Sequence, residues 1–217
     1  MPDEAINGPV PYPPAKRALD RAGAALLVLA ASPLFAAAPA SIAADHLRHP
    51  RDRGSWLYRE RRISRGREFD VLKFRVLRED VIAEVRRLGL HARQREADAA
   101  NLTRSGVFLK RRDLDELPQL LNVLRGDLSL VGPRPWPRTM VDGQIATGLD
   151  YRLRVMAGWT GPVQARKGDP TATDYTDIDL EYVEACRTLS QWQLVRLDLR
   201  ILRTTVHTML RGEGLQY

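Results

Sequence analysis

A run of 23 residues without a charged side chain, residues 22–44, most constrains how this chain of 217 residues can fold. It reads AGAALLVLAASPLFAAAPASIAA, and about 20 apolar residues suffice for a helix to cross a bilayer. A cleaved signal peptide and a simple spanning helix both fit this length and the basic residues that precede it. The interior and the flanks of the run are therefore needed to choose between structures.

Both the interior and the flanks favour a third structure, a helix that enters the membrane, breaks and leaves on the same side. Pro33 removes a backbone hydrogen bond near the middle of the run, and Ser32 can satisfy the freed carbonyl. Basic residues flank the run on both sides: Lys16, Arg17 and Arg21, then Arg48, Arg51 and Arg53. Because basic flanks prefer the cytosol, we predict a re-entrant helix at residues 15–47, on the cytosolic face of the inner (cytoplasmic) membrane.

The rest of the sequence indicates a tail and one cytosolic domain. Residues 1–14 are rich in Pro and lack periodicity, which predicts a disordered tail. Residues 48–217 are long enough for one catalytic domain with a substantial core. The single Cys186 excludes an internal disulfide, and the four histidines lack zinc spacing. We expect a mixed α/β fold, mostly helical.

The positive charge of the chain is concentrated in one segment. Between Asp45 and Arg75 there are ten Lys and Arg against five Asp and Glu, which is +5 of the total +7. Such a segment suits an anionic membrane surface, a phosphorylated substrate or nucleic acid. The aromatic content is only 6%, without aromatic and basic residues interleaved along a strand, and this argues against nucleic acid.

Local patterns predict a small β-hairpin and amphipathic helices. Strands are expected at 56–58 and 69–76, joined by the turn Ser64-Arg65-Gly66. Residues 78–100 are highly charged and predict a solvated surface helix. Its apolar side chains share one helical face: Val81, Ile82, Val85 and Leu88.

The C-terminal segment, residues 189–212, predicts a long amphipathic helix. Apolar side chains recur at steps of three and four residues: Trp192, Val195, Leu199, Leu202, Val206 and Met209. The other face carries arginines: Arg196, Arg200, Arg203 and Arg211. The helix could lie on a membrane interface or pack its apolar face on the protein's own core, and we favour the core.

The stretch DLDELPQ, residues 113–119, places three carboxylates within four residues. Asp113 and Glu116 have the spacing of a capping box at a helix start. The backbone N–H groups of a helix start also attract anions and lower the pKa of a nearby carboxylate. An ionised Asp115 could then attack phosphorus or hold a divalent metal. The spacing alone leaves both interpretations open.

The stretch Gly132-Pro133-Arg134-Pro135 holds an arginine between two prolines. The prolines restrict the backbone on both sides, so the guanidinium is carried on a stiff support. Such a preset cation can clamp a phosphate. A rigid surface turn with a solvated arginine is the alternative.

Several segments together resemble the bacterial sugar transferase family, the monotopic polyprenyl-phosphate phosphoglycosyl transferases that start glycan assembly on a lipid carrier. They are KFR at 73–75, LDELPQLLNVLRGDLSLVGPRP at 114–135, Tyr151 with Arg154, and TGxxQ at 160–164. The similarity runs from about Lys16 to the C-terminus, and its central motif is long enough to be specific.

The resemblance implies an activity. Family members anchor through a re-entrant helix broken at Ser-Pro, which matches Ser32-Pro33. With Mg²⁺, they transfer a sugar 1-phosphate from a nucleoside diphosphate sugar, usually a UDP-sugar, to polyprenyl (undecaprenyl) phosphate, and UMP leaves. Glycans that start this way include exopolysaccharide, capsule, O-antigen and glycoprotein glycans.

The resemblance also implies site residues. Asp115 corresponds to the nucleophile that forms a covalent phosphosugar intermediate, and Glu116 to the second acid. These two are also the expected metal ligands. The expected phosphate-binding cations are Lys73, Arg75, Lys110 and Arg134.

Departures from the family pattern indicate a divergent subgroup with a changed donor or sugar preference. Lys110 stands where the family commonly has Arg, Asp113 where it has Ser or Thr, and residues 157–161 read AGWTG in place of PGITG. The charged insert at 78–100 is also longer than in minimal members. A non-catalytic membrane scaffold or a lipid-carrier-binding paralogue in the same pathway is the alternative function. Membrane lipid and downstream glycosyltransferases are the expected partners, and a homodimer is left open.

Overall fold

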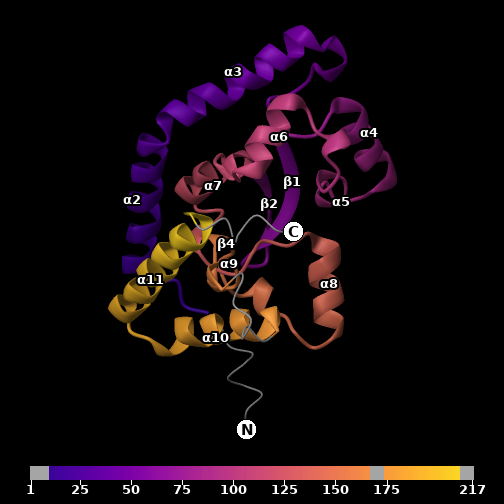
Figure 1. The fold of residues 1–217 in the computed structure, drawn as a ribbon. Coiled ribbons are helices and arrows are strands. Elements are labelled where there is room, and N and C mark those ends of the chain that lie inside the picture. Colours follow the sequence, from indigo (N-terminus) through magenta and orange to yellow (C-terminus); the bar gives the residue numbers. More distant parts are fainter. Residues whose placement is uncertain (1–9, 167–173, 211–217) are drawn as a thin grey trace. The chain divides into compact units, whose positions relative to one another are not determined.

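The computed structural model describes residues 10–166 and 174–210, and these are mostly helical (Figure 1). The chain divides into two compact units. The first takes in Met1–Leu27, Glu60–Val71 and Leu120–Gln216, and the second Val28–Arg59 and Leu72–Gln119. These two units are defined by contacts between residues. The predicted division into a membrane helix, 15–47, and a cytosolic domain, 48–217, is defined by membrane insertion, so it stays a prediction.

The uncharged run forms two helices, α2 (Pro14–Ala30) and α3 (Ser32–Arg48), which meet at Ala31. Pro33 lies in the first turn of α3, where a proline without an N–H removes no helical bond. In the part of the chain that the structure describes, no one helix has the length and apolarity to cross a bilayer. The bent pair of α2 and α3, 60° apart, meets both requirements together, by length and composition only (Figure 1). The predicted break is therefore present, and re-entry into a membrane stays a proposal.

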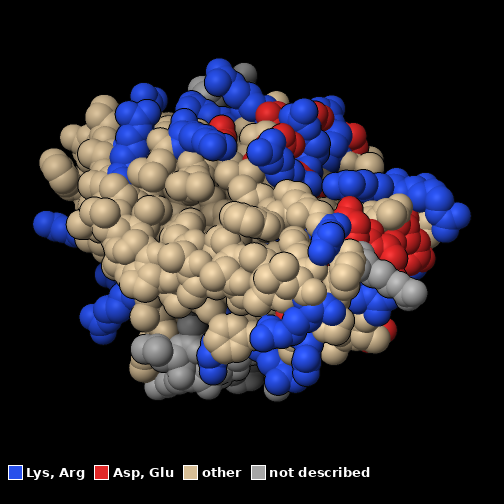
Figure 2. Space-filling model, turned by 90° about the horizontal axis from the view of Figure 1, so that it is seen from above, with Lys and Arg blue, Asp and Glu red and all other residues tan. Residues whose placement is uncertain are grey.

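The apolar side chains of this pair are largely uncovered. Leu26, Leu29 and Leu47 are each at least two-thirds exposed. Figure 2, seen from the side on which α3 lies in Figure 1, shows a broad area without charged side chains, with many Lys and Arg and some Asp and Glu at its margins. An uncovered apolar area with basic borders is typical of membrane contact.

The start of α2 differs from the prediction, because the first unit buries it. The Lys16 ammonium lies 2.5 Å from an Asp198 carboxylate oxygen and donates to the Val131 carbonyl at 3.0 Å. Asp20 accepts hydrogen bonds from the Ser129 hydroxyl and the Leu130 amide. The first turns of α2 are thus held by protein. Of the predicted tail, residues 1–9 lie outside the described residues, and Val10 is buried.

The first unit is built around two short parallel strands, β3 (Ser129–Val131) and β4 (Gly158–Thr160), which pair Ser129 with Gly158 and Val131 with Thr160. Its helices are α7 (Gln119–Arg125, whose first residue lies in the second unit), α8 (Arg138–Ala146), α9 (Pro162–Ala165), α10 (Tyr175–Thr188) and α11 (Gln191–Leu210), with a 3₁₀ turn, η4 (Tyr151–Leu153). The short helix α9 packs on both α10 and α11.

The buried face of α11 is not the predicted one. On the predicted apolar face Trp192, Leu199 and Val206 are exposed, at 64%, 48% and 56%. Val195 and Leu202 are half-buried, and the Met209 side chain and Arg211 lie outside the described residues. The helix instead buries Leu194 and Asp198 completely. The preference for packing the apolar face on the protein's own core is therefore wrong. Its physical reason is the buried ion pair of Asp198 with Lys16, which brings a charged residue inside.

The predicted hairpin is confirmed as β1 (Leu57–Ser64) and β2 (Arg67–Phe74). The connecting residues Arg65 and Gly66 have positive φ angles of 49° and 75°. Two consecutive left-handed residues make the tight turn whose twist matches paired strands. The hairpin contributes residues to both units.

The second unit packs α3, the end of β2, α4 (Glu79–Leu88), α5 (Arg93–Glu96) and α6 (Arg104–Arg111) around one apolar cluster, with 3₁₀ turns η1 (Pro50–Asp52), η2 (Ala99–Asn101) and η3 (Leu114–Glu116). Three of the four predicted face residues in 78–100 lie in this cluster, and Leu88 is half exposed. The predicted helix is correct for α4, which ends before Gly89 in the left-handed conformation.

Candidate active site

The predicted reactive acids lie in one 3₁₀ turn of the second unit, η3. Asp113 precedes this turn with a φ of 51°, in the left-handed region, and its side chain makes no capping hydrogen bond. The predicted capping box is therefore wrong, and Asp115 does not stand at the start of an α-helix. The reactivity of Asp115 is therefore set by the side chains around it and not by the N–H groups of a helix end.

Two leucines fix this turn on the core. Leu114 and Leu117, on either side of Asp115 and Glu116, pack against the apolar cluster of the second unit. Asp115 is completely buried, and Glu116 is 12% exposed. The apolar positions of LDEL thus anchor the turn, so the carboxylates are held without helix-end bonds.

Two lysines from other elements face the two acids. Lys73, near the end of β2, lies 2.9 Å from Glu116. Lys110, in the last turn of α6, lies 3.4 Å from Asp115 Oδ2. The helix that carries Lys110 is itself fixed, because its cap Thr103 accepts from the Gly106 amide at 2.9 Å. The structure thus brings four predicted site residues together.

A fifth residue of the cluster, Glu96, was not predicted. It ends α5, is 8% exposed, and accepts a hydrogen bond from Lys110 Nζ at 2.6 Å. The charged segment that carries it was interpreted as a solvated surface helix. A glutamate among many charged residues gives no sequence signal of burial, so only the fold could reveal it.

Burial and charge set the protonation of the cluster. Burial raises the pKa of Asp115 to about 6, although the Lys110 ammonium opposes the shift. Burial alone would lower the pKa of Lys110, but Asp115 and Glu96 raise it above its ordinary value. Burial also disfavours ionised Glu96, yet Lys73 and Lys110 hold its pKa below the usual range. At neutral pH these groups are ionised, with Asp115 the most readily protonated.

One oxygen of Asp115 bears directly on ligand binding. Among the described residues, Oδ1 is buried and has no hydrogen-bond partner. An orphaned buried carboxylate oxygen is costly unless a ligand satisfies it. The described residues hold no group of three His, Cys, Asp or Glu that could cage a metal. An Mg²⁺ bound by one or two carboxylates, with the remaining ligands from water and substrate phosphate, fits this donor set.

Arg75, a predicted phosphate-binding residue, has other partners in the second unit. It is 2% exposed, and its guanidinium contacts Glu79 at 2.8 Å, the His46 ring and the Asp52 carbonyl oxygen. These contacts join α3, η1 and α4. They account for its burial, and a role in phosphate binding stays a prediction.

Arg134 belongs to the first unit, on the loop after β3. Its carbonyl oxygen accepts a hydrogen bond from Arg152 Nη1 at 2.7 Å. Arg152 also pairs with Asp179 at 2.6 Å and stacks 3.9 Å from the Trp136 ring centroid. The buried Arg152 guanidinium therefore holds this loop through three contacts, and the stiff support for Arg134 stays a prediction.

The glycines of this loop are required by close backbone approach. A Cβ at Gly158 or at Gly161 would overlap the Gly132 backbone, and one at Gly132 would overlap the Met156 carbonyl. This explains why AGWTG keeps both glycines of PGITG although its first and third residues differ.

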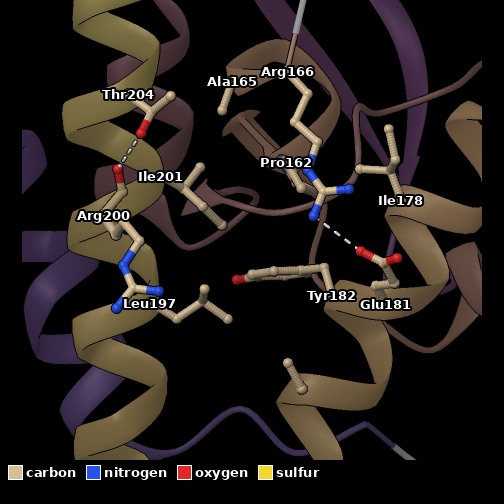
Figure 3. Close-up of a pocket in the computed structure, with 11 residues that line it drawn as sticks. Pro162, Ala165, Arg166, Ile178, Glu181, Tyr182, Leu197, Arg200, Ile201 and Thr204 are labelled. Atoms are coloured by element: carbon tan, nitrogen blue, oxygen red, sulfur yellow. Dashed lines mark hydrogen bonds and ion pairs between the residues drawn. The ribbon is translucent and has the colours of Figure 1, made fainter. Parts of the chain in front are cut away.

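A separate cavity of about 370 Å³ lies in the first unit between α9, α10 and α11 (Figure 3). Its lining is largely apolar, with Ile178, Tyr182 and Ile201 among the residues. Arg166 and Glu181 form a 3.0 Å ion pair at its edge. The only carboxylate in the lining is therefore paired, and the acid and lysine cluster of the second unit is the stronger candidate for chemistry.

A buried carboxylate between lysines is suited to nucleophilic chemistry on a phosphorylated ligand, and the bent apolar helix pair is suited to a ligand at a membrane. The sequence model of the family described as bacterial sugar transferase matches residues 12–212. The chain therefore belongs to the bacterial sugar transferase family, which confirms the resemblance drawn from its motifs.

The names of similar proteins agree with this family assignment. The chain is 36% identical over 203 residues to an undecaprenyl-phosphate glucose phosphotransferase of Komagataeibacter xylinus, with 88% of this chain and 35% of the relative covered. It is 36% identical over 211 residues to a UDP-glucose:undecaprenyl-phosphate glucose-1-phosphate transferase of Caulobacter vibrioides, covering 92% and 71%. It is 32% identical over 211 residues to the exopolysaccharide production protein ExoY of Rhizobium meliloti, covering 92% and 87%. The chain thus spans about a third of the first relative and most of the other two.

Proposed function

We propose that this protein transfers a sugar 1-phosphate from a nucleoside diphosphate sugar, in the first instance a UDP-sugar, to undecaprenyl or another polyprenyl phosphate. The observation that carries the proposal is the completely buried Asp115, with one oxygen unpartnered and Lys110 at 3.4 Å from the other. The names of the Komagataeibacter and Caulobacter relatives support the lipid acceptor and the sugar phosphate. The Rhizobium relative is named for exopolysaccharide production, and initiation of such a polysaccharide is the pathway step that this activity would supply.

In the first half-reaction, an Asp115 oxygen attacks the phosphorus that bears the sugar. The new Asp115 O–P bond forms as the bond from that phosphorus to the UMP oxygen breaks, and UMP leaves with the electron pair. Lys110 and Lys73 face the shifting negative charge. Asp115 must be ionised to attack, which its pKa of about 6 allows at neutral pH.

In the second half-reaction, a phosphate oxygen of the polyprenyl phosphate attacks the same phosphorus. The diphosphate bond forms, the Asp115 O–P bond breaks, and the carboxylate is regenerated. Two bulky anions thereby use one site in turn. Glu116, held by Lys73 at 2.9 Å, assists this transfer as the second acid.

Asp115 and Glu116 would hold Mg²⁺, which when bound offsets negative charge on the transferred phosphoryl group. Arg134 on its fixed loop and Arg75 are further phosphate-binding candidates. In this proposal α2 and α3 contact the membrane from its cytosolic face, where the polyprenyl phosphate acceptor would be bound; their combined length and apolarity support it.

Incubating the detergent-purified full chain with Mg²⁺, undecaprenyl phosphate and a panel of UDP-sugars tests the proposal. UMP release is expected with the wild type and not with Asp115→Asn. A wild type that is silent across the panel, or a fully active Asp115→Asn variant, would refute it. Lipid-carrier binding and complementation in cells that persist in an Asp115→Ala variant would instead support the scaffold function.

A further inference from the structure

Glu96 is the one member of the acid and lysine cluster without a role in the proposed reaction. It lies outside the reactive turn, at the end of α5, and it is 8% exposed. Lys110 Nζ lies 2.6 Å from Glu96 and 3.4 Å from Asp115 Oδ2, so it is bound more closely to Glu96. A buried carboxylate destabilises the fold unless it is paired, and the hydrogen bond from Lys110 is the close contact that pairs Glu96.

We propose that Glu96 is a positioning residue, which holds the Lys110 ammonium beside Asp115 without letting it close onto the attacking carboxylate. This inference rests on the proposed function. It assigns a purpose to the charged segment 78–100, which supplies Glu96 to the site.

The geometry shows why such a holder is useful. Without Glu96, Lys110 would lose its nearer partner and could approach Asp115 to about 2.8 Å, the usual length of a charge-assisted hydrogen bond. That ion pair would occupy a nucleophilic oxygen and would have to break before attack. With Glu96 as its nearer partner, Lys110 stays charged and close, where it can meet the phosphate oxygens as charge shifts onto them.

Lysine requires this support more than arginine would. A guanidinium presents a planar fork that can join two carboxylates by its own geometry, whereas an ammonium is a point charge on a flexible stem. The motif resemblance implies arginine as the common residue at the position of Lys110. A second carboxylate, Glu96, then compensates for the lost fork by holding the ammonium at 2.6 Å.

The charges of the cluster predict that Glu96→Gln changes kcat and the KM for the donor differently. Three carboxylates, Glu96, Asp115 and Glu116, face two ammonium groups, Lys73 and Lys110. Glu96→Gln makes the cluster less negative, so the anionic donor should bind at least as well. The rate of attack should fall, because Lys110 then pairs with the nucleophile.

The test measures UMP release from a UDP-sugar by the full chain with saturating undecaprenyl phosphate, so that the enzyme turns over and kcat and the KM for the donor are determined separately. Glu96→Gln should lower kcat roughly 10- to 100-fold, the size expected when a reacting group is misplaced by about 1 Å. The KM for the donor should not rise. Glu84→Gln is the matched control, because Glu84 also pairs with a basic residue, Arg95, at 2.7 Å but is 39% exposed. It should stay within about twofold of wild type.

A double-mutant cycle separates positioning from general structural damage. In a Lys110→Met background, Glu96→Gln should cause no further loss, because it acts only through Lys110. The double variant removes both charges of the Glu96–Lys110 ion pair, so neither is left buried without its partner. It therefore still tests the inference if one of the single variants folds poorly.

Three outcomes would overturn the inference. They are a wild-type kcat in Glu96→Gln, an equal loss in Glu84→Gln, and the same loss from Glu96→Gln with or without Lys110. A wild type that releases no UMP with any donor refutes the proposed function itself, and the inference falls with it.

Discussion

Replacing Asp115 by asparagine should stabilise the fold while it abolishes the reaction. The folded protein raises the pKa of this carboxyl from 3.8 to about 6, chiefly by burial. A difference of about two pKa units corresponds to about 3 kcal/mol of destabilisation by the ionised form. Because the folded pKa is the higher one, this penalty is absent below pH 4, grows between pH 4 and 6, and is complete above pH 6. Asparagine is neutral at every pH and avoids it.

Thermal unfolding of the detergent-purified protein, followed by tryptophan fluorescence, measures the effect. At pH 8, Asp115→Asn should raise the Tm by roughly 5 to 10 °C, and at pH 5 the gain should fall to about half. Asp142→Asn is the control, since Asp142 is half exposed in a surface pair and should change the Tm little. If Asp115→Asn is no more stable than wild type at pH 8, or if its gain does not depend on pH, the buried-charge argument is wrong.

Three further outcomes are expected. The rate of UMP release without lipid acceptor should rise between pH 5 and 7 with an apparent pKa near 6, because Asp115 must ionise to attack; a flat profile from pH 5 to 7.5 would contradict this. Gly158→Ala should lower the free energy of unfolding by about 1 to 3 kcal/mol or more, because its Cβ would overlap the Gly132 backbone. Gly143→Ala, which meets nothing within 4 Å, should be neutral or slightly stabilising in the same unfolding assay. Chelation with EDTA should stop UMP release and added Mg²⁺ should restore it, and retained activity in EDTA would exclude the proposed metal.

The features predicted correctly from the sequence are set by neighbouring residues. The break at Ser32-Pro33 follows from proline chemistry, and the β1–β2 turn follows from Arg65-Gly66. The apolar face of α4 follows from helical spacing. Each is decided within about ten residues, so a local pattern contains the needed information.

The predictions that failed depend on distant partners. Helical spacing identifies two faces of α11, but the buried one is chosen by Asp198, whose partner Lys16 lies 182 residues away. The burial of Glu96 depends on Lys110, fourteen residues along the chain and on another helix. A single sequence gives no signal for such pairs, because a buried glutamate or aspartate looks the same as a solvated one.

The reactive acids lie in a 3₁₀ turn and not at the predicted helix start, and this changes the expected pKa of Asp115. A helix N-terminus would have lowered the pKa of Asp115 and kept it comfortably ionised. The structure instead buries it beside two other carboxylates and leaves Oδ1 without a partner among the described residues. Its ion pair with Lys110 does not offset the cost of burial, so Leu114 and Leu117 hold it there by packing on the core at either side. The leucines of LDEL are therefore as necessary as the acids, because they keep a destabilising carboxylate in place beside Lys110.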